Sequence, residues 1–310
     1  MKALVTGGAG FIGSHLVERL LTDGYAVHVI DDMSSGSHSY VHSDAALHIL
    51  DIRSEKCRQL ITLEKPDVVF HLAAQADVQR SLQEPGFDAD VNIAGTLNVL
   101  EACRDGSVSK FIFASTCAVY GAMEKELLTE EDPAAPISYY GISKLTAESY
   151  IRTFHSLYGL PYTILRFGNV YGPRQTPKGE GGVVSVFTSR IFNGSPLRIH
   201  GDGAQTRDFV HVTDVVRANA AAVGLGHQET IHVSTGTRTS VNDLVRILLH
   251  LRGVPIPAIH TSAKIGDIRN SCLDNMKAFR LLRWKPQIEL YDGLQHLLRE
   301  YENNESNPKR

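Results

Sequence analysis

We predict an α/β fold in which a doubly wound parallel sheet is followed by a smaller C-terminal α/β lobe. Apolar runs of strand length alternate with helical patterns, which is typical of parallel strands joined by crossover helices. A glycine-rich turn separates the first run from the first helical pattern, and the periodicity weakens beyond residue 167. With 310 residues, 43% of them hydrophobic, the chain exceeds one typical domain and can bury a substantial core.

The first part of the chain supplies the elements of the sheet. Apolar runs predict strands at 2–6, 26–31, 46–50, 67–71, 110–115 and 161–166. Amphipathic patterns predict helices at 12–23, 54–64, 88–104 and 139–158. Parallel strands need connections of this length, so the alternation predicts a parallel sheet with helices on its faces.

The second part has shorter elements and a loop-rich beginning. Strand-like runs at 197–200, 208–212 and 231–233 mix with helical patterns near 182–193, 213–223, 240–250, 274–282 and 290–302. We expect one domain over 1–166, with about 204–236 interleaved into it, and a smaller lobe over 167–310.

The turn after the first run has the sequence TGGAGFIG, residues 6–13. Gly7 allows a sharp turn, Gly10 a close approach to a pyrophosphate, and Gly13 close packing of the helix, whose first turn holds Phe11 and Ile12. The N-terminus of that helix offers unpaired N–H groups and a partial positive charge. This pattern predicts a Rossmann-type dinucleotide site.

Asp31 ends the second apolar run, where a carboxylate accepts hydrogen bonds from the ribose hydroxyls of NAD. No arginine occurs between Asp32 and Asp51 to bind a 2′-phosphate, so the sequence favours NAD as the cofactor. Asp51 and Ile52 suit the adenine, although Asp51 is equally a candidate for a turn residue at the strand end.

Residues at other strand and helix ends complete the predicted NAD site. Small Ala73 and Ala74 let the backbone approach the cofactor, and Asn92 and Ser115 are assigned to the same site. His71, beside the two alanines, is expected to be a structural histidine rather than a catalytic one.

Tyr140 and Lys144 are four residues apart in a helical pattern, so they share one helix face. A nearby ammonium lowers the pKa of a phenol, which lets a tyrosine take a hydroxyl proton near neutral pH. Thr116, at the end of a predicted strand, can share that proton. Both side chains of the pair also belong to the predicted cofactor site. Tyr139 is assigned to packing or to the edge of the substrate site.

Charge and cysteine content exclude several classes of function. The net charge is −3 with both signs interspersed, which predicts neither nucleic-acid nor membrane binding. No apolar run approaches a membrane span, and we expect no signal peptide because the first run is a strand. Four cysteines without paired spacing predict reduced thiols, no metal site and a cytoplasmic protein.

Together these segments resemble the extended short-chain dehydrogenase/reductase family, in particular its nucleotide-sugar epimerases and dehydratases. The resemblance extends from residue 1 to about residue 300 and rests on ordered motifs. They are TGGAGFIGSH (6–15), HLAA (71–74), NIAGT (92–96), STCAVYG (115–121), YGISK (140–144), RFGNVYGP (166–173), GDGAQTRDFVHV (201–212) and GDIR (266–269).

The resemblance implies a nucleotide diphosphate site in the C-terminal lobe. It assigns Asn169 and Arg207 to the diphosphate, Asp267 to the uridine ribose, and Arg269 to a second phosphate contact. Family epimerases commonly have an arginine where this chain has Lys264. Three apolar residues are candidates both for walls around the base and for core: Val184, Phe187 and Leu197.

The resemblance also narrows the reaction. Dehydratases of the family carry an Asp–Glu pair, and decarboxylases a glutamate, where this chain has Cys117 and Ala118. A reductase of the family would use NADPH, and the carboxylate of Asp31 disfavours the 2′-phosphate of that cofactor. The reaction expected is therefore reversible epimerisation at carbon 4 of a UDP-hexose through a 4-keto sugar.

The sugar and the assembly are predicted from single features. In epimerases of the family, a small residue at the position of Ser271 admits an N-acetyl group, so the resemblance implies UDP-GlcNAc and UDP-GalNAc as well as UDP-Glc and UDP-Gal. A UDP-glucuronate 4-epimerase, with Arg80 or Arg174 as the cation, is the alternative, followed by a dehydratase and by a non-catalytic NAD sensor or scaffold. The resemblance also implies a homodimer, because members of the family dimerise through a four-helix bundle made from the elements at 88–104 and 139–158.

Overall fold

The computed structural model describes residues 1–122, 125–177, 182–253, 255–263 and 268–306. Its main sheet has seven parallel strands in the order β11-β6-β5-β4-β1-β2-β3. The strands are β1 (Lys2–Thr6), β2 (Ala26–Asp31), β3 (Ala46–Ile49), β4 (Val68–His71), β5 (Lys110–Thr116), β6 (Tyr162–Phe167) and β11 (Glu229–Val233). The predicted fold class is confirmed.

The chain moves outward from β1 in one direction through β2 and β3, and in the other direction through β4, β5 and β6. The order therefore reverses between β1 and β4, and ligands of such sheets bind at the carboxyl ends of the strands beside this point. The glycine turn and the HLAA motif follow these two strands.

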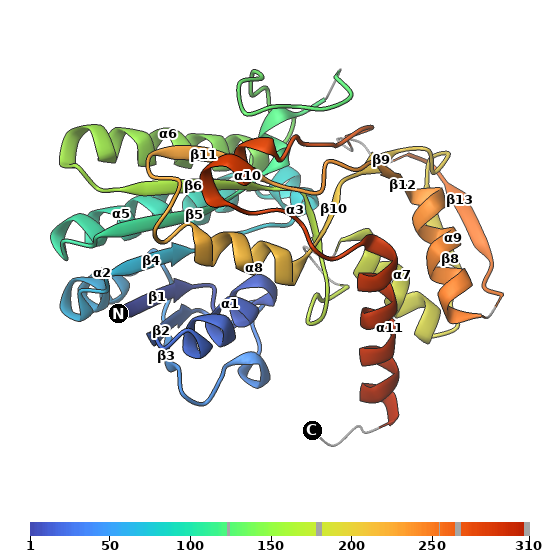
Figure 1. Ribbon diagram of the computed structural model, residues 1–310, viewed down its shortest axis with the longest axis horizontal. Coiled ribbons are helices and arrows are strands. Elements are labelled where there is room, and N and C mark those ends of the chain that lie inside the picture. The colour runs from blue at the N-terminus through green and yellow to red at the C-terminus, as the bar shows by residue number, and fades with distance from the viewer. Residues whose placement is uncertain (123–124, 178–181, 254, 264–267, 307–310) are drawn as a thin grey trace.

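Helices cover both faces of the main sheet (Figure 1). One face packs on α1 (Phe11–Thr22), α8 (Val212–Ala221) and α10 (Met276–Leu282). The other packs on α2 (Glu55–Glu64), α5 (Gly95–Asp105) and α6 (Tyr139–Tyr158). Alternate strand residues face opposite sides, so Ile112 lies in the first core and Phe111 and Phe113 lie in the second.

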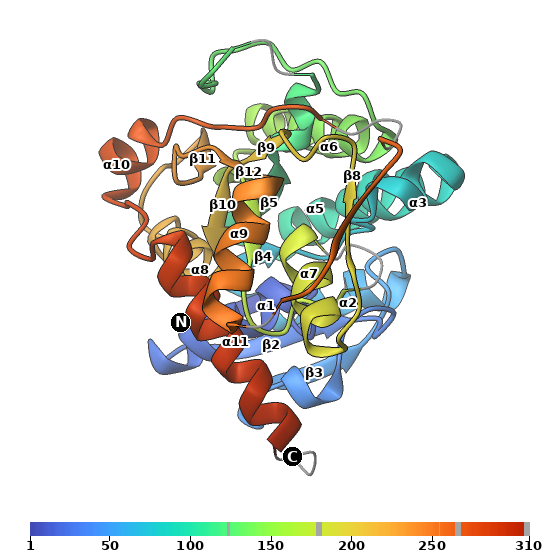
Figure 2. The ribbon, with the colours of Figure 1, turned by 90° about the vertical axis from the view of Figure 1, so that its right-hand side faces the viewer.

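The C-terminal lobe has its own core beside the sheet. Figure 2 shows α7 (Val183–Phe192), α9 (Val241–Arg252) and α11 (Leu290–Ser306) grouped together, and β8 (Leu197–His200) pairs with β13 (Ala258–Thr261). Buried Phe187, Leu244 and Leu294 belong to the cluster that these elements enclose.

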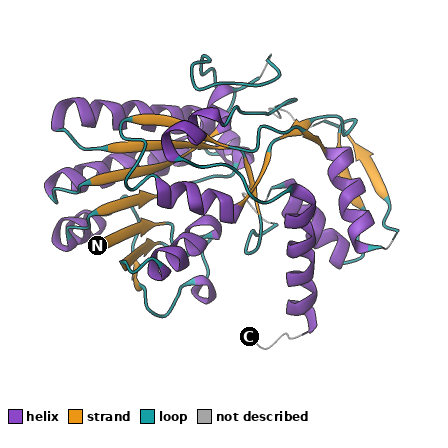
Figure 3. Cartoon of the chain, in the orientation of Figure 1, coloured by secondary structure: helices purple, strands orange, loops and turns teal. Residues whose placement is uncertain are grey.

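Two short sheets connect the main sheet to the lobe, as the strands between them in Figure 3 show. In one, β7 (Asn169–Tyr171) runs parallel to β10 (Phe209–His211). In the other, β9 (Thr206–Arg207) runs antiparallel to β12 (Thr239–Ser240).

The predicted helix over 88–104 is divided in the structure. Asp77 caps α3 (Val78–Gln83), Pro85 begins α4 (Pro85–Ala89), and a π-helical turn, η2 (Asp90–Ala94), leads into α5. Sequence periodicity missed α3 and α4 because both are too short to repeat an apolar stripe. Two 3-10 turns, η1 (His38–Tyr40) and η3 (Cys117–Tyr120), lie in connections. Within the described ranges, every helix is too short or too polar to span a bilayer.

Candidate active site

The glycine turn packs tightly against the end of β4. Gly7 has a φ of +71°, and a Cβ there would lie 2.8 Å from the backbone nitrogen of Ala73. A Cβ on Gly13 would lie 2.1 Å from the carbonyl oxygen of Gly7. The N-cap of α1 is Gly10, which has no side chain to cap the helix, so its first turn, with Phe11 and Ile12, presents backbone N–H groups. This cradle fits the pyrophosphate of NAD.

Asp31 joins the glycine turn to the loop after β2. Its Oδ2 accepts a hydrogen bond from the Ala9 N–H (2.9 Å) and its Oδ1 one from the Met33 N–H (2.9 Å). Burial raises the pKa of this carboxyl against the effect of these two donors. A carboxylate oxygen has two acceptor positions, so Asp31 retains capacity for ribose hydroxyls.

Asp51 is held by Arg53, which donates to both carboxylate oxygens at 3.0 Å. These hydrogen bonds keep the pKa of Asp51 below its ordinary value despite partial burial. The Arg53 N–H also donates to Asp51 (2.8 Å), which is the turn role that the sequence left open. Ile52 is buried against Gly95, and the adenine contact of both residues stays a prediction.

His71 lies in a directed chain of hydrogen bonds behind Ala73 and Ala74. The Ala73 N–H donates to Thr6 Oγ1 (3.2 Å), which lies 2.7 Å from His71 Nδ1. The Thr96 hydroxyl donates to the Asn92 carbonyl (2.6 Å), so His71 Nε2, 3.0 Å away, must donate to Thr96. Burial lowers the pKa of His71 to about 3. It is therefore a neutral structural histidine, as predicted.

The Asn92 side chain bonds to protein groups. Its Oδ1 accepts from the Gln75 N–H (2.9 Å), and its Nδ2 donates to the Gln75 carbonyl (2.9 Å) and to Ser143 Oγ (3.1 Å). Asn92 thereby connects the loop after β4 to the first turns of α6. Direct contact with the cofactor stays a prediction.

Tyr140 and Lys144 lie in the first turns of α6, which Ser138 caps by accepting from the Gly141 N–H (3.1 Å). Lys144 is buried, and its Nζ donates to the Ala114 carbonyl (3.0 Å). A Cβ on Gly141 would lie 2.6 Å from the Ala118 carbonyl oxygen, so the helix end meets the residues after β5. The structure therefore brings Tyr140 and Lys144 to the strand end that carries Thr116.

Thr116 and Ser115 have different surroundings because neighbouring strand residues face opposite sides. Thr116 is half-buried, and its hydroxyl accepts from the Ala118 N–H (3.1 Å). The Ser115 hydroxyl donates to buried Glu148 of α6 (2.6 Å), so its proton is engaged within the protein. The contact of Ser115 with the cofactor stays a prediction.

Glu148 is a residue that sequence reasoning missed. It follows Lys144 by one helical turn and forms a bidentate ion pair with buried Arg166 of β6, with distances of 2.9 and 2.6 Å. Arg166 also donates to the Tyr120 hydroxyl (2.6 Å). The sequence did contain a signal for this residue, because the spacing of four places the charged Glu148 on the same helix face as Tyr140 and Lys144.

Predicted substrate residues meet beside the end of β5. The Ser271 hydroxyl lies 3.6 Å from Cys117 Sγ. Burial raises the pKa of the Cys117 thiol, and the positive charge of Arg207 acts against that increase. The Thr206 N–H of β9 donates to the Arg269 carbonyl (2.9 Å), which joins β9 to the segment that contains Ser271. The strand β9, the segment around Ser271 and η3 thus converge on one place.

Asn169 begins β7, and its N–H donates to the Asp208 carbonyl (2.7 Å). Its side-chain Oδ1 is buried and has no hydrogen-bond partner in the described part of the chain. A buried polar atom in this state favours a bound ligand as the missing partner. Asp267 and Lys264, the other residues implied at this site, lie outside the described residues.

Several predicted contacts have other partners in the structure. Val184, Phe187 and Leu197 are buried in the core of the lobe, the alternative that the sequence left open. Arg269 forms an exposed ion pair with Asp202 (2.8 Å). The roles of these residues at the substrate stay predictions.

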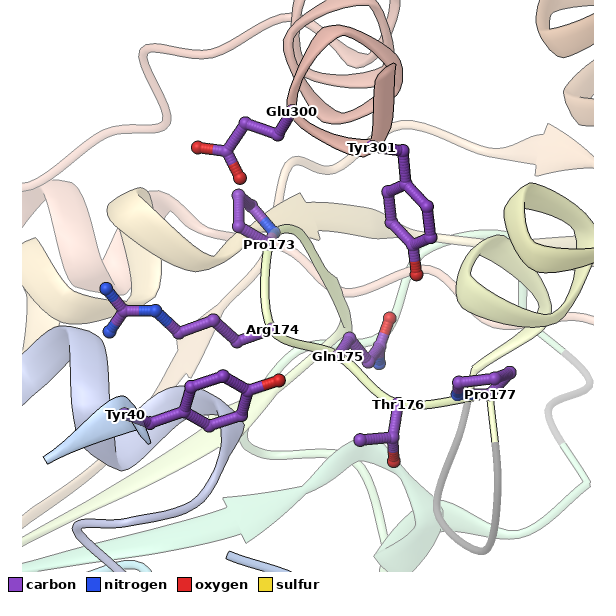
Figure 4. Close-up of a pocket in the computed structure, with 8 residues that line it drawn as sticks. All are labelled: Tyr40, Pro173, Arg174, Gln175, Thr176, Pro177, Glu300 and Tyr301. Atoms are coloured by element: carbon purple, nitrogen blue, oxygen red, sulfur yellow. The ribbon is translucent and has the colours of Figure 1, made fainter. Parts of the chain in front are cut away.

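The two arginines considered for a glucuronate carboxylate are also engaged. Arg80 pairs with Glu84 (3.2 Å) and lies 4.2 Å from the centre of the Phe87 ring. Arg174 pairs with Glu18 (2.5 Å) and borders a pocket of about 180 Å³ between the loop at 173–177 and α11 (Figure 4). Tyr40 and Tyr301 line the same pocket.

A Rossmann sheet, a glycine turn beside its switch point and a tyrosine–lysine pair at the end of β5 define a dinucleotide-dependent enzyme. The model of the NAD dependent epimerase/dehydratase family matches residues 3–233, and the chain belongs to this family. NAD is therefore its cofactor, and the resemblance predicted from the motifs is confirmed.

Individual relatives are similar over almost the whole chain. A UDP-glucose 4-epimerase from Mycolicibacterium smegmatis is 41% identical over 301 residues, which cover 95% of this chain and 96% of the relative. The crystal structure of a UDP-glucose 4-epimerase from Thermotoga maritima with UDP-glucose has a TM-score of 0.96 and 43% identity, covering 98% of this chain and 99% of that one. A UDP-N-acetylglucosamine 4-epimerase from Methanobrevibacter ruminantium, in complex with UDP-N-acetylmuramic acid, has a TM-score of 0.93 and 33% identity, covering 98% of each chain.

Proposed function

We propose that this protein is an NAD-dependent 4-epimerase of UDP-hexoses, acting on UDP-Glc and UDP-Gal and also on UDP-GlcNAc and UDP-GalNAc. The observation that carries the proposal is the pairing of Tyr140 and Lys144 at the β5 end with a non-acidic neighbourhood. The residues after Thr116 are Cys117, whose thiol has a raised pKa because of burial, and Ala118. A site without a carboxylate there suits proton exchange at one hydroxyl and opposes dehydration.

Proton transfer at carbon 4 is the part of the reaction assigned to this chain. Tyr140 accepts the hydroxyl proton, Thr116 shares it, and the buried Lys144 ammonium favours the phenolate form of Tyr140. The chemistry that NAD supplies when bound is reversible hydride transfer at carbon 4. The 4-keto sugar turns about its diphosphate link, and Tyr140 then returns the proton to the other epimer.

The diphosphate is assigned to Arg207 and Asn169. A guanidinium matches phosphate oxygens in a bidentate geometry, and the buried Asn169 amide has an atom left for a ligand. By resemblance, Asp267 accepts from the uridine ribose.

Hexoses are favoured over glucuronate as the sugar. Arg80 and Arg174, the cations available for a carboxylate at carbon 6, already pair with Glu84 and Glu18. Ser271 beside Cys117 is small and supports the acceptance of N-acetyl groups. A scaffold role without catalysis is disfavoured because Tyr140, Lys144 and Thr116 are all present.

The experiment is to incubate the purified protein separately with UDP-Glc, UDP-GlcNAc and UDP-glucuronate and to follow the products by proton NMR. Appearance of the 4-epimer from the hexoses is the expected result. Fastest conversion of UDP-glucuronate would favour the alternative epimerase. Loss of water or no change with all three would contradict the proposal for these sugars.

A homodimer built on α5 and α6 is part of the proposal. Val99, Leu100 and Ile151 are buried within the monomer, whereas Leu157 and Tyr158 of α6 are 67% and 51% exposed. Arg104 of α5 lies 5.0 Å from the centre of the Tyr158 ring, so the two helices form one surface. Light scattering of the purified protein should give twice the mass of one chain, and Leu157→Glu should reduce it.

A further inference from the structure

Asp208 lies between Arg207 and Phe209 and is completely buried. Its Oδ1 accepts hydrogen bonds from the N–H and the hydroxyl of Thr235, at 2.8 and 2.6 Å. Its Oδ2 accepts from the N–H groups of Gly236 (3.0 Å) and Leu273 (3.3 Å), with the Cys272 thiol at 3.8 Å. Among the described residues, no lysine or arginine forms an ion pair with this carboxylate.

A buried carboxylate is costly unless its oxygens are satisfied. Asp208 is satisfied by backbone donors from two loops that are distant in sequence, the turn after β11 and the segment after Ser271. Removing one acceptor would leave a donor N–H without its partner, and that of Leu273 is fully buried. The carboxylate therefore determines where both loops lie.

The residues next to these contacts are those assigned to the substrate. Arg207 precedes Asp208 in the chain, and Ser271 lies two residues before Leu273. The Asp208 carbonyl accepts from the Asn169 N–H (2.7 Å). Gly168 allows this approach, since a Cβ there would lie 2.9 Å from the same carbonyl oxygen.

We propose that Asp208 is the positioning residue of the nucleotide-sugar site, holding Arg207, Asn169 and Ser271 in one arrangement. It touches no reacting atom and acts only through these neighbours. The inference rests on the proposed function, because it assumes that the three neighbours bind a UDP-sugar. Small displacements of binding groups lower binding and rate strongly, so the role has a measurable effect.

Asp208→Asn is the primary variant, because an amide nitrogen cannot accept from the N–H groups that the carboxylate holds. Asp214→Asn is the matched control. Asp214 is equally buried in α8 and accepts from the N–H groups of Gln287 and Ile288, both at 3.0 Å, but these lead into α11. Calorimetry of UDP and of NAD with each folded variant measures the two sites separately.

We expect Asp208→Asn to raise the Kd for UDP and the KM for the UDP-sugar about tenfold or more, with an unchanged Kd for NAD. Asp214→Asn should leave the Kd for UDP unchanged even if it lowers the melting temperature. An unchanged Kd for UDP in folded Asp208→Asn would overturn the role of Asp208. Equal weakening by both variants would also overturn it, because the effect would then be a general loss of stability.

Two further measurements keep the inference testable. If Asp208→Asn does not fold, Thr235→Val removes only the hydroxyl donor (2.6 Å) and should weaken UDP binding, whereas Thr235→Ser should restore it. Unchanged UDP binding in Thr235→Val would then contradict the inference. If the unmodified protein binds no UDP, both the proposed nucleotide and the role of Asp208 are contradicted. If the unmodified protein and all variants bind UDP normally, only the role of Asp208 is contradicted.

Discussion

The two halves of the candidate site are each organised around a buried carboxylate, but the partners differ. Glu148, one helical turn after Lys144 of the catalytic pair, forms an ion pair with Arg166 and accepts a hydrogen bond from Ser115. Asp208, which follows Arg207 of the substrate residues, accepts hydrogen bonds from backbone N–H groups of two loops. The catalytic half joins the helix α6 to the strands β5 and β6, which are already paired in the main sheet, so side-chain contacts suffice. The substrate half joins loops, and their backbone must itself be held.

The charges of the two carboxyl groups respond differently to burial. Burial raises the pKa of Glu148, but the hydrogen bonds and charge of Arg166 outweigh it, and the net result is a lowered pKa. Burial also raises the pKa of Asp208, and there the backbone and hydroxyl donors are too weak to reverse it. The negative charge of Glu148 is compensated by an opposite charge, whereas that of Asp208 is compensated by the dipoles of N–H and hydroxyl groups.

The largest expected effect separates the halves by function. Tyr140→Phe removes the proposed base and should lower kcat by about 10²- to 10⁴-fold, the usual contribution of a general base. The Kd for UDP should stay unchanged, because the nucleotide contacts lie in the other half. Steady-state kinetics and calorimetry check the two parts. Undiminished turnover would refute the assignment of Tyr140.

The next effect is on stability. Arg166→Met leaves buried Glu148 with only the more exposed Arg152 as a cation (3.2 Å), which should reduce the free energy of unfolding by about 3 kcal/mol. The control is Glu148→Leu combined with Arg166→Met, which removes both charges and should recover much of the loss. Denaturant unfolding of both variants measures the difference. A double variant as unstable as the single one would mean that the ion pair is not what Arg166 contributes.

A smaller effect is expected on substrate range. Ser271→Tyr places a ring beside Cys117, and it should lower activity on UDP-GlcNAc about tenfold or more while sparing UDP-Glc. Ser271→Ala, which keeps the space, is the control. Competition assays with both sugars report the ratio. Full activity of the tyrosine variant on the N-acetyl sugar would refute the steric argument.

The smallest effect is the sign of two pH dependences. Glu148 has a lowered native pKa, so its contribution to stability increases as pH rises from that value to the ordinary glutamate pKa. Asp208 has a raised native pKa, so its contribution decreases as pH rises from the ordinary aspartate pKa to that value. Both pH dependences are measured by denaturant unfolding across the acid range. The proteins compared are the wild type, the Glu148–Arg166 double variant and Asp208→Asn. Equal signs would contradict the comparison.

The sequence predicted the strands of the main sheet and the positions of Tyr140 and Lys144, because periodicity and helix spacing are local properties. It did not predict that the Ser115 hydroxyl bonds to Glu148, because one position along a strand reverses the side that a side chain faces. Asp208 was missed for a different reason. Its Leu273 donor is 65 residues away, and nothing in the sequence indicates which loops share one carboxylate.

The hydrogen-bond chain through His71 has a consequence for the interpretation of kinetics. Each proton from the Ala73 N–H to the Asn92 carbonyl has a defined direction, and the imidazole, with a pKa of about 3, carries no charge at the pH of a cell. His71 therefore contributes no change of charge between mildly acidic and mildly alkaline solution. An ionisation seen in the rate of turnover over that interval therefore reports on a group other than His71. Tyr140, the proposed base, is the first residue to examine.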